Sequence, residues 1–226
     1  MRPIGWGRER RRRRAASLAP QGALRDYLSA AEQDPRTPLS QVRLLALDFE
    51  TTSLDSTTGH PLSAGWVAVD GASIRLGGAG SVLLRPPSQG VGDSAVFHGI
   101  TDDEASLGLD EQTAVERILA ALTGRVLLAH HASIESSFLI AACRRIWNVV
   151  PEFPCVDTLD LEHRLATRGG SEPVPGSLRL GAARERYGLP AYSAHEALTD
   201  ALACAELYVA QVSVLGAVSP LRSVLS

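Results

Sequence analysis

The sequence contains no lysine, and all 22 of its basic residues are arginine, a bias typical of a G+C-rich bacterial genome. It has only three cysteines, which lie far apart and form no Cys-x-x-Cys pair: Cys143, Cys155 and Cys204. This scatter argues against a disulfide framework or a zinc knuckle and favours a reducing compartment, so we expect a cytoplasmic protein. No apolar stretch approaches the roughly 18–20 residues that a membrane span requires, and no membrane association is expected.

Charge is divided unevenly along the chain. Residues 1–43 hold 10 arginines and 4 acidic residues, a net charge of +6, whereas residues 44–226 hold 12 arginines and 21 acidic residues, a net charge of −9. The division predicts a basic N-terminal arm before an acidic folded body. Within the arm, the run from Arg8 to Arg14 is compatible with phosphate binding and equally with a solvated, unstructured tail.

Hydrophobic periodicity predicts a mixed sheet covered by helices, in one α/β domain. Strands are expected over residues 42–50, 63–71, 72–76, 81–86 and 125–129, with the Gly-Gly-Ala-Gly run at 77–80 interrupting a meander. Helices are expected over residues 15–33, from 101, and over 110–124, 133–147, 156–166, 178–187 and 196–214. We therefore expect a basic arm with a short helix and linker at 1–41, a folded domain at 42–215 and a short tail at 216–226.

Two carboxylates end the first expected strand. Asp48 and Glu50 are separated by one residue, so in a strand both side chains point to the same face. Neighbouring carboxylates repel each other and are costly to bury. The pair therefore predicts a site at which cations relieve the repulsion.

Two later segments place further candidate ligands near this pair. Glu135 falls in the first turn of a helix, a position that the helix dipole alone would also favour. His195 and Asp200 are five residues apart, roughly 500° of helical rotation, so His195 is expected in a loop before the helix and Asp200 on its second turn. Four carboxylates suit two Mg²⁺ or Mn²⁺ ions acting on a phosphodiester, and a histidine could deprotonate the attacking water.

Four ordered motifs carry a resemblance to a known family: LDFETT (47–52), HHASIESSFL (130–139), DTLDL (157–161) and HEALTDA (195–201). They resemble the DEDD-type 3′–5′ exonucleases of the histidine subclass, which include the proofreading subunit of DNA polymerase III, RNase T and oligoribonuclease. The resemblance covers residues 42–212 and implies a ribonuclease H-like fold with a mixed five-stranded sheet. It also implies that Asp48 bridges two metal ions, that Glu50 and Asp200 complete one site, and that His195 is the general base.

The resemblance also implies a set of substrate-binding residues. At some motif positions this sequence departs from the residue that the family usually has. Its expected substrate-binding residues are Thr51, Thr52, Phe97, His98, Ile100 and His131, although core packing explains Phe97 and Ile100 nearly as well. His131 replaces the family's usual Asn, and Glu135 replaces Asp. The extra methylene of Glu135 requires a shifted backbone or another rotamer to bind the second ion. Asp157 is explained as a helix cap.

The expected function is metal-dependent 3′–5′ hydrolysis of single-stranded nucleic acid to nucleoside 5′-monophosphates. DNA is favoured over RNA as the expected substrate. No residue that reads the sugar's 2′ position can be singled out. The alternatives are an RNA-trimming exoribonuclease and a non-catalytic nucleic-acid-binding module with a weakened metal site. The few residues after the last helix favour a stand-alone repair or processing enzyme over a polymerase subunit, and QVSVLG (211–216) fits a helix end better than a sliding-clamp peptide.

Overall fold

The strand that carries the acidic pair lies at the centre of the sheet. A computed structural model of the chain describes residues 6–86, 99–170, 172–193 and 195–226, and its five strands are ordered β3-β2-β1-β4-β5. The strands are β1 (Arg43–Thr51), β2 (Pro61–Asp70), β3 (Ser73–Leu83), β4 (Val126–Ala129) and β5 (Cys155–Asp157). β1, β2 and β3 pair antiparallel, whereas β4 and β5 run parallel to β1. The predicted mixed five-stranded sheet is confirmed.

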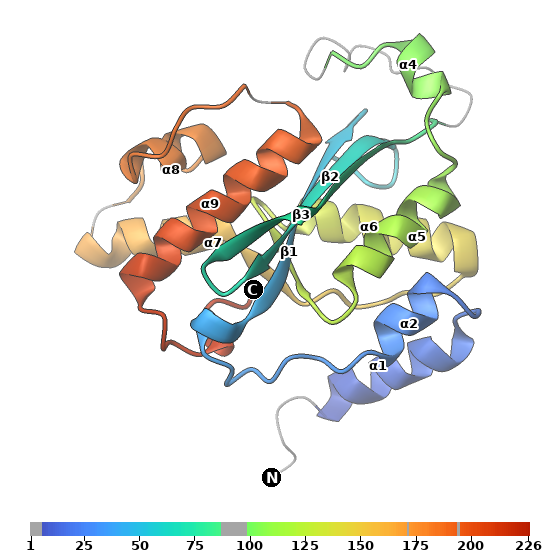
Figure 1. Cartoon of the computed structure of the whole chain (residues 1–226), viewed down its shortest axis with the longest axis horizontal. Helices are drawn as coiled ribbons and strands as arrows, with labels where there is room; N and C mark the ends of the chain where they lie inside the picture. The colour runs from blue at the N-terminus through green and yellow to red at the C-terminus, as the bar shows by residue number, and fades with distance from the viewer. Residues whose placement is uncertain (1–5, 87–98, 171, 194) are drawn as a thin grey trace.

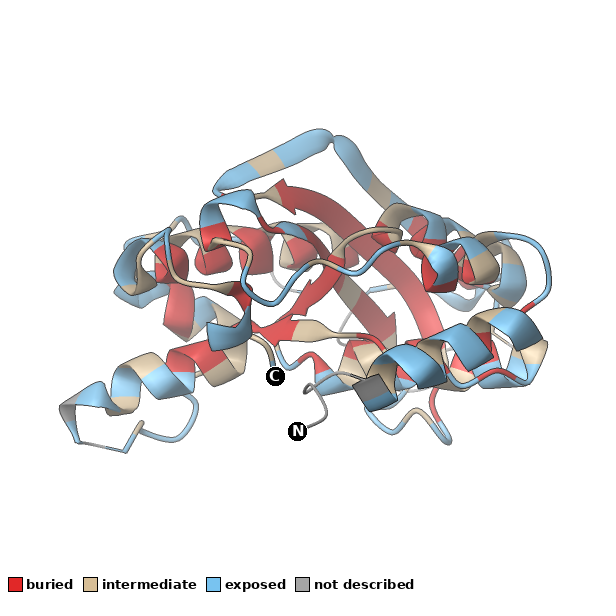
Figure 2. Cartoon of the chain, turned by 90° about the horizontal axis from the view of Figure 1, so that it is seen from below, coloured by how far each residue is buried: buried red, intermediate tan, exposed pale blue. Residues whose placement is uncertain are grey.

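Helices cover both faces of the sheet, so β1, β2, β4 and β5 are mostly buried between two layers, whereas the edge strand β3 is largely exposed (Figures 1 and 2). One layer holds α1 (Trp6–Leu18), α2 (Ala23–Ser29), α5 (Glu111–Leu122) and α6 (Ser133–Trp147), and the other holds α7 (Thr158–Ala166) and α9 (Ala197–Leu215). The short helices are α4 (Asp102–Ser106) and α8 (Leu180–Arg186), with single 3₁₀ turns at Leu39–Gln41, Thr167–Gly169 and Leu221–Ser223.

The two-residue period of β1 decides which layer meets the acidic pair. Leu45 and Leu47 pack against the α5 and α6 layer, whereas Leu44 packs with α9. Because alternate side chains share a face, Asp48 and Glu50 lie on the same face as Leu44. The acidic pair therefore faces the helix that carries Asp200.

α9 is the one helix in the described ranges that is long and apolar enough, by length and composition, to cross a membrane. Its buried side packs against β1 and β2, and this core position accounts for the composition. Gln211, near its end, is fully buried and donates hydrogen bonds to the carbonyl of Thr158 and the carboxylate of Glu162, both at 2.9 Å. The segment 211–215 is thus part of α9, as expected for a helix end.

Several expected helix starts are confirmed by their caps. Thr101 and Glu104 form a reciprocal capping box at α4, and Asp110 accepts a hydrogen bond from the Thr113 amide at the start of α5. These caps satisfy amides that have no partner within the helix.

The predicted interruption of the meander is present as a break in register, although the two strands expected at 72–76 and 81–86 are parts of one strand, β3. The pairing with β2 shifts between the Trp66–Gly80 pair and the Ala68–Arg75 pair, so it passes over the glycine run. A Cβ on Gly80 would lie 2.5 Å from the Trp66 ring, so glycine allows this ring to lie across β3. The residue-by-residue prediction also missed β5, because its three residues are too short to show a period.

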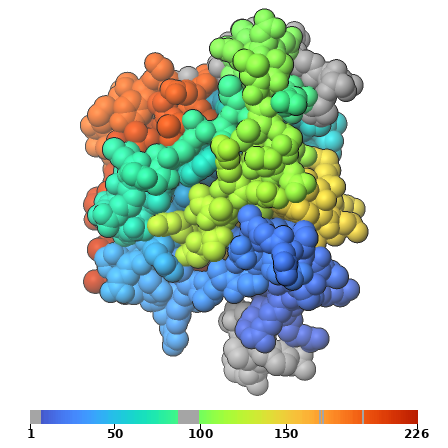
Figure 3. All heavy atoms as spheres, turned by 45° about the vertical axis from the view of Figure 1, so that its right-hand side comes forward, coloured from blue at the N-terminus to red at the C-terminus, as the bar shows by residue number. Residues whose placement is uncertain are grey.

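The N-terminal arginine run is helical over the described residues 6–18, and the single helix expected at 15–33 is two helices. Arg8 and Arg11 pair with Glu152, which is far away in sequence. α1 packs on α2, which packs on α5, as the blue and yellow-green surfaces in Figure 3 show. These long-range ion pairs and contacts, which no local pattern shows, fix the arginine run on the folded body.

Candidate active site

The acidic residues predicted from three separate segments meet at one edge of the sheet. Because β1, β4 and β5 are parallel, their carboxyl ends share an edge, and α6 begins just beyond β4 at that edge. β1 supplies Asp48 and Glu50, and the first turn of α6 supplies Glu135. Asp200 lies on the first turn of α9 and not on the second, because the helix begins at Ala197.

A glycine allows α9 to come close to the acidic pair. Gly65 of β2 is the strand partner of Asp48. A Cβ built on Gly65 would lie 2.1 Å from the Leu198 nitrogen and 2.3 Å from the Ala197 carbonyl carbon. Sequence reasoning missed this residue, although glycine inside a strand is a known signal for close backbone approach.

Asp200 holds the backbone of the segment that carries the histidine. The His195 amide donates a 2.8 Å hydrogen bond to Asp200 Oδ2, and His195 has a left-handed φ of 71°. Potential ligand atoms of Glu50, His195 and Asp200 all lie within 4.8 Å of one another. The predicted loop histidine is therefore brought next to two of the predicted carboxylates.

Burial and mutual repulsion disfavour the ionised forms of these carboxylates. Desolvation, followed by the charges of Glu135, Asp200 and Glu50, raises the pKa of Asp48 well above its usual range. Desolvation also raises the pKa of Glu135 to about 8. The same cause raises the pKa values of Glu50 and Asp200, with the neighbouring His195 opposing the shift in both.

The donor set fits divalent cations. Glu135 is 3% exposed, and its Oε2 atom is buried with no hydrogen-bond partner in the described part of the chain. An unpaired buried carboxylate oxygen is costly unless a cation or a proton compensates it. Carboxylate oxygens are the preferred ligands of Mg²⁺ and Mn²⁺. Asp48, Glu50, Glu135 and Asp200 are therefore suited to hold such ions.

Asp157 fixes the turn that presents Glu135. Its carboxylate accepts hydrogen bonds of 2.9 Å from the amides of His131, Ala132 and Leu159. The bond to Leu159 caps α7, as expected, and the other two hold the start of α6. His131 has a φ of 79°, a strained value that these bonds stabilise. The role of Asp157 at α6 depends on a contact across 25 residues and was not predicted.

The predicted substrate-binding residues differ in their exposure and in their distance from the acidic residues along the chain. Thr51 is half-buried at the end of β1, and the Thr52 hydroxyl accepts a hydrogen bond from the His60 amide that shapes the following loop. His131 is exposed at the start of α6. Phe97 and His98 lie outside the described residues.

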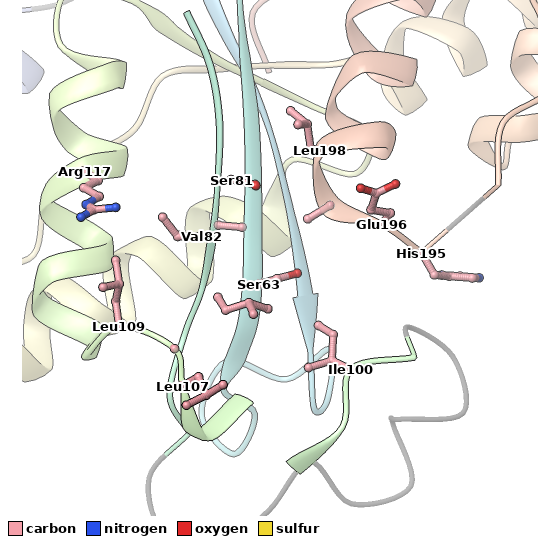
Figure 4. A pocket seen from close by; sticks show the side chains of 14 residues that line it. Ser63, Ser81, Val82, Ile100, Leu107, Leu109, Arg117, His195, Glu196 and Leu198 are labelled. Atoms are coloured by element: carbon pink, nitrogen blue, oxygen red, sulfur yellow. The ribbon is translucent and has the colours of Figure 1, made fainter. Parts of the chain in front are cut away.

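Ile100 and His195 line a common cavity of about 500 Å³, which also includes Ser63, Leu107 and Arg117. In Figure 4, Ile100 and His195 lie near the end of the central strands, and Arg117 lies on the opposite side of the hollow. The cavity adjoins Glu50 and Asp200 through His195 and mixes apolar with polar side chains. Such a surface is suited to a base and its sugar.

Comparisons with known sequences match this chain to one family model and to bacterial DNA polymerases. A family model described as Exonuclease (RNase T type) matches residues 45–208. The PolC-type DNA polymerase III of Thermotoga maritima is 26% identical over 175 residues, which are 76% of this chain and 12% of the polymerase. The chain thus spans about an eighth of this curated relative.

Solved structures share the fold at low sequence identity. Cell-death related nuclease 4 has a TM-score of 0.64 at 19% identity, over 80% of this chain and 66% of the nuclease. E. coli exonuclease I in complex with a dT13 oligonucleotide has a TM-score of 0.64 at 19% identity, over 77% of this chain and 42% of that protein. These similarities confirm the predicted ribonuclease H-like fold.

Proposed function

The chain belongs to the exonuclease family, as its motifs predicted, and we propose that it removes nucleotides one at a time from the 3′ end of single-stranded DNA. The observation that carries the proposal is the convergence of Asp48, Glu50, Glu135, Asp200 and His195 at one sheet edge. The oligonucleotide bound to exonuclease I in its solved complex supports single-stranded DNA as the substrate class.

Enzymes of this family depend on divalent metal ions, and we propose that the four carboxylates hold two of them, Mg²⁺ or Mn²⁺. When bound, such ions polarise the scissile phosphate and stabilise the charge that develops on its oxygens. Asp48 is at the centre of the cluster, since its carboxylate interacts with Glu135, Asp200 and Glu50. The position of Asp48 supports its assignment as the residue shared by both ions.

We assign His195 as the general base that accepts the proton of the attacking water. The residue is exposed, it adjoins Glu50 and Asp200, and it lines the cavity beside the site. A hard ion such as Mg²⁺ prefers the carboxylate oxygens, which leaves the imidazole available for proton transfer. The hydrogen bond from its amide to Asp200 keeps the backbone of His195 next to the carboxylates.

Replacing His195 with alanine is expected to lower kcat by about 10²–10⁴-fold with little change in KM, because the base acts only in the chemical step. At a saturating concentration of Mg²⁺ or Mn²⁺, which keeps the carboxylate ligands deprotonated, the remaining fall in rate at acidic pH should also disappear, since the proposed base is gone. Steady-state rates from pH 5 to 9 measure both effects. His163→Ala, on the exposed side of α7, is the control, and an unchanged acidic limb in His195→Ala would assign the base role to another group.

The proposed function is tested with 5′-labelled single-stranded 15-mers of DNA and RNA of matched sequence. With Mg²⁺ or Mn²⁺, the wild-type chain should shorten the DNA from its 3′ end in single-nucleotide steps and release nucleoside 5′-monophosphates. Asp48→Ala should abolish cleavage. Intact DNA and RNA with the wild-type chain would favour a non-catalytic binding module, and faster loss of RNA would favour an exoribonuclease.

For the cellular role, we propose a nuclease of DNA repair or processing in the cytoplasm. The three free thiols Cys143, Cys155 and Cys204 support a reducing compartment. The similarity to PolC-type polymerases gives association with a polymerase as the alternative role. Co-purification of the tagged chain from its source cells distinguishes the two roles.

A further inference from the structure

A second cavity adjoins the proposed catalytic cluster, which consists of Asp48, Glu50, Glu135, Asp200 and His195, on the side of α8. It has a volume of about 850 Å³ and is lined by His195 and Asp200, by α8 and by the segment 189–192. α8 packs beside α9, as Figure 1 shows. His195 lines both this cavity and the one that contains Ile100. A nucleic acid strand with its scissile bond at the catalytic cluster therefore has hollows available in two directions.

An aromatic ring in this second cavity is held in place and is still accessible. Tyr192 is 40% exposed, and one face of its ring lies against the Arg184 guanidinium, 4.6 Å from the ring centroid. Its hydroxyl donates a 2.9 Å hydrogen bond to Glu206. Arg184 is itself buried and donates to the carbonyls of Ala203 and Pro190. The ring is thus fixed in advance, which lowers the entropy cost of stacking a ligand on it.

The same cavity contains an arginine, Arg179, that has no charged partner among the described residues. Arg179 is exposed, and within the described ranges its guanidinium has neither an ion-pair partner nor a hydrogen bond. The two arginines of α8 differ in this respect, because Arg184 pairs with Glu206 and Arg186 pairs with Glu162. Arg179 therefore offers attraction for a phosphate close to a cluster of carboxylates that would repel one.

We propose that this cavity binds a nucleotide on the 5′ side of the scissile bond, with its base stacked on Tyr192 and its phosphate at Arg179. The inference rests on the proposed function, since it assigns a second subsite to the same strand. Single-stranded nucleic acids are bound by combinations of an aromatic platform and basic side chains, and such sites tolerate any base. The cavity provides both elements beside the proposed base His195.

Kinetics and binding with a 5′-fluorescein dT10 test this subsite. Tyr192→Leu and Arg179→Ala should each raise KM by about tenfold, the size of a lost stacking or phosphate contact, with less than a twofold change in kcat. Tyr192→Phe retains the ring and its contact with Arg184 but loses the hydrogen bond to Glu206, so its KM should lie between those of the wild type and Tyr192→Leu. Arg179→Ala should also reduce the salt dependence of binding by about one unit of slope, measured by fluorescence anisotropy in EDTA.

Arg144→Ala is the matched control, because Arg144 is an exposed arginine on α6 that, among the described residues, also has no ion-pair partner. Values of KM for Tyr192→Leu and Arg179→Ala equal to that of Arg144→Ala would overturn the subsite while leaving the exonuclease intact. A lower kcat with unchanged KM in Tyr192→Leu would also overturn it and make Tyr192 a positioning residue for the His195 segment. Failure of the wild-type chain to cleave the oligonucleotide would instead overturn the proposed function.

Discussion

Gly65→Ala is expected to lower exonuclease activity by at least about a hundredfold, although Gly65 has no side chain to take part in the reaction. The added Cβ would lie 2.1 Å from the Leu198 nitrogen, so either β2 or the start of α9 must move. The atoms nearest to this Cβ are backbone atoms of Ala197 and Leu198, which cannot rotate away as a side chain would. A displacement of about 1 Å at a catalytic site can reduce the rate by about 10²-fold.

The same substitution should lower Tm by several degrees, because overpacking costs about 1–3 kcal/mol and a chain of this size loses about 2–4 °C per kcal/mol. Activity on a single-stranded oligonucleotide and thermal unfolding measure the two effects. Gly77→Ala is the control, since a Cβ on Gly77 of β3 meets no atom within 4 Å. Full activity in Gly65→Ala would show that the close approach does not position His195 and Asp200.

Glu135→Gln is expected to uncouple stability from activity. Burial raises the pKa of Glu135 to about 8 in the folded chain, whereas an unfolded glutamate titrates near about 4.3. Between these values the folded chain holds the extra proton, so metal-free stability should fall as pH rises through this window, by roughly 1 kcal/mol per pH unit for this group. Asp48, whose pKa is also raised, acts in the same direction.

A glutamine at this position cannot ionise, so the metal-free variant should be more stable than the wild type at pH 8 and similar at pH 4. Mg²⁺ or Mn²⁺ should stabilise the wild type most at pH 8 and the variant much less, because the variant lacks one carboxylate ligand. Its activity should fall by about a hundredfold or more, with a higher metal concentration needed for half-maximal rate.

Thermal unfolding from pH 4 to 8.5, with EDTA or with added metal, measures these effects. Glu116→Gln, on the surface of α5, is the matched control and should follow the wild type at every pH. A metal-free wild type whose stability rises from pH 5 to 8 would contradict the assigned shift of Glu135. An equal metal-induced shift in Glu135→Gln and wild type would remove Glu135 from the set of ligands.

Local signals in the sequence are enough to define part of the site. The two-residue period of β1 places Asp48 and Glu50 on one face, and apolar periods define α5 and α6, with Asp110 capping α5. The order of four short motifs was enough to identify the family, which the comparison with the exonuclease family model confirmed. The helical period also separated His195 from Asp200 and placed the histidine before α9.

Which segments touch depends on packing between elements that lie far apart in the sequence. Gly65 lies against the start of α9, and Asp157 accepts hydrogen bonds from the amides at the start of α6, so both contacts join segments distant in sequence. The arginine run of α1 shows the same limit, since its pairing with Glu152 turns a charged segment into part of the folded body. Local patterns record the period and charge of a segment, but the free energy of a contact depends on the partner that the fold supplies.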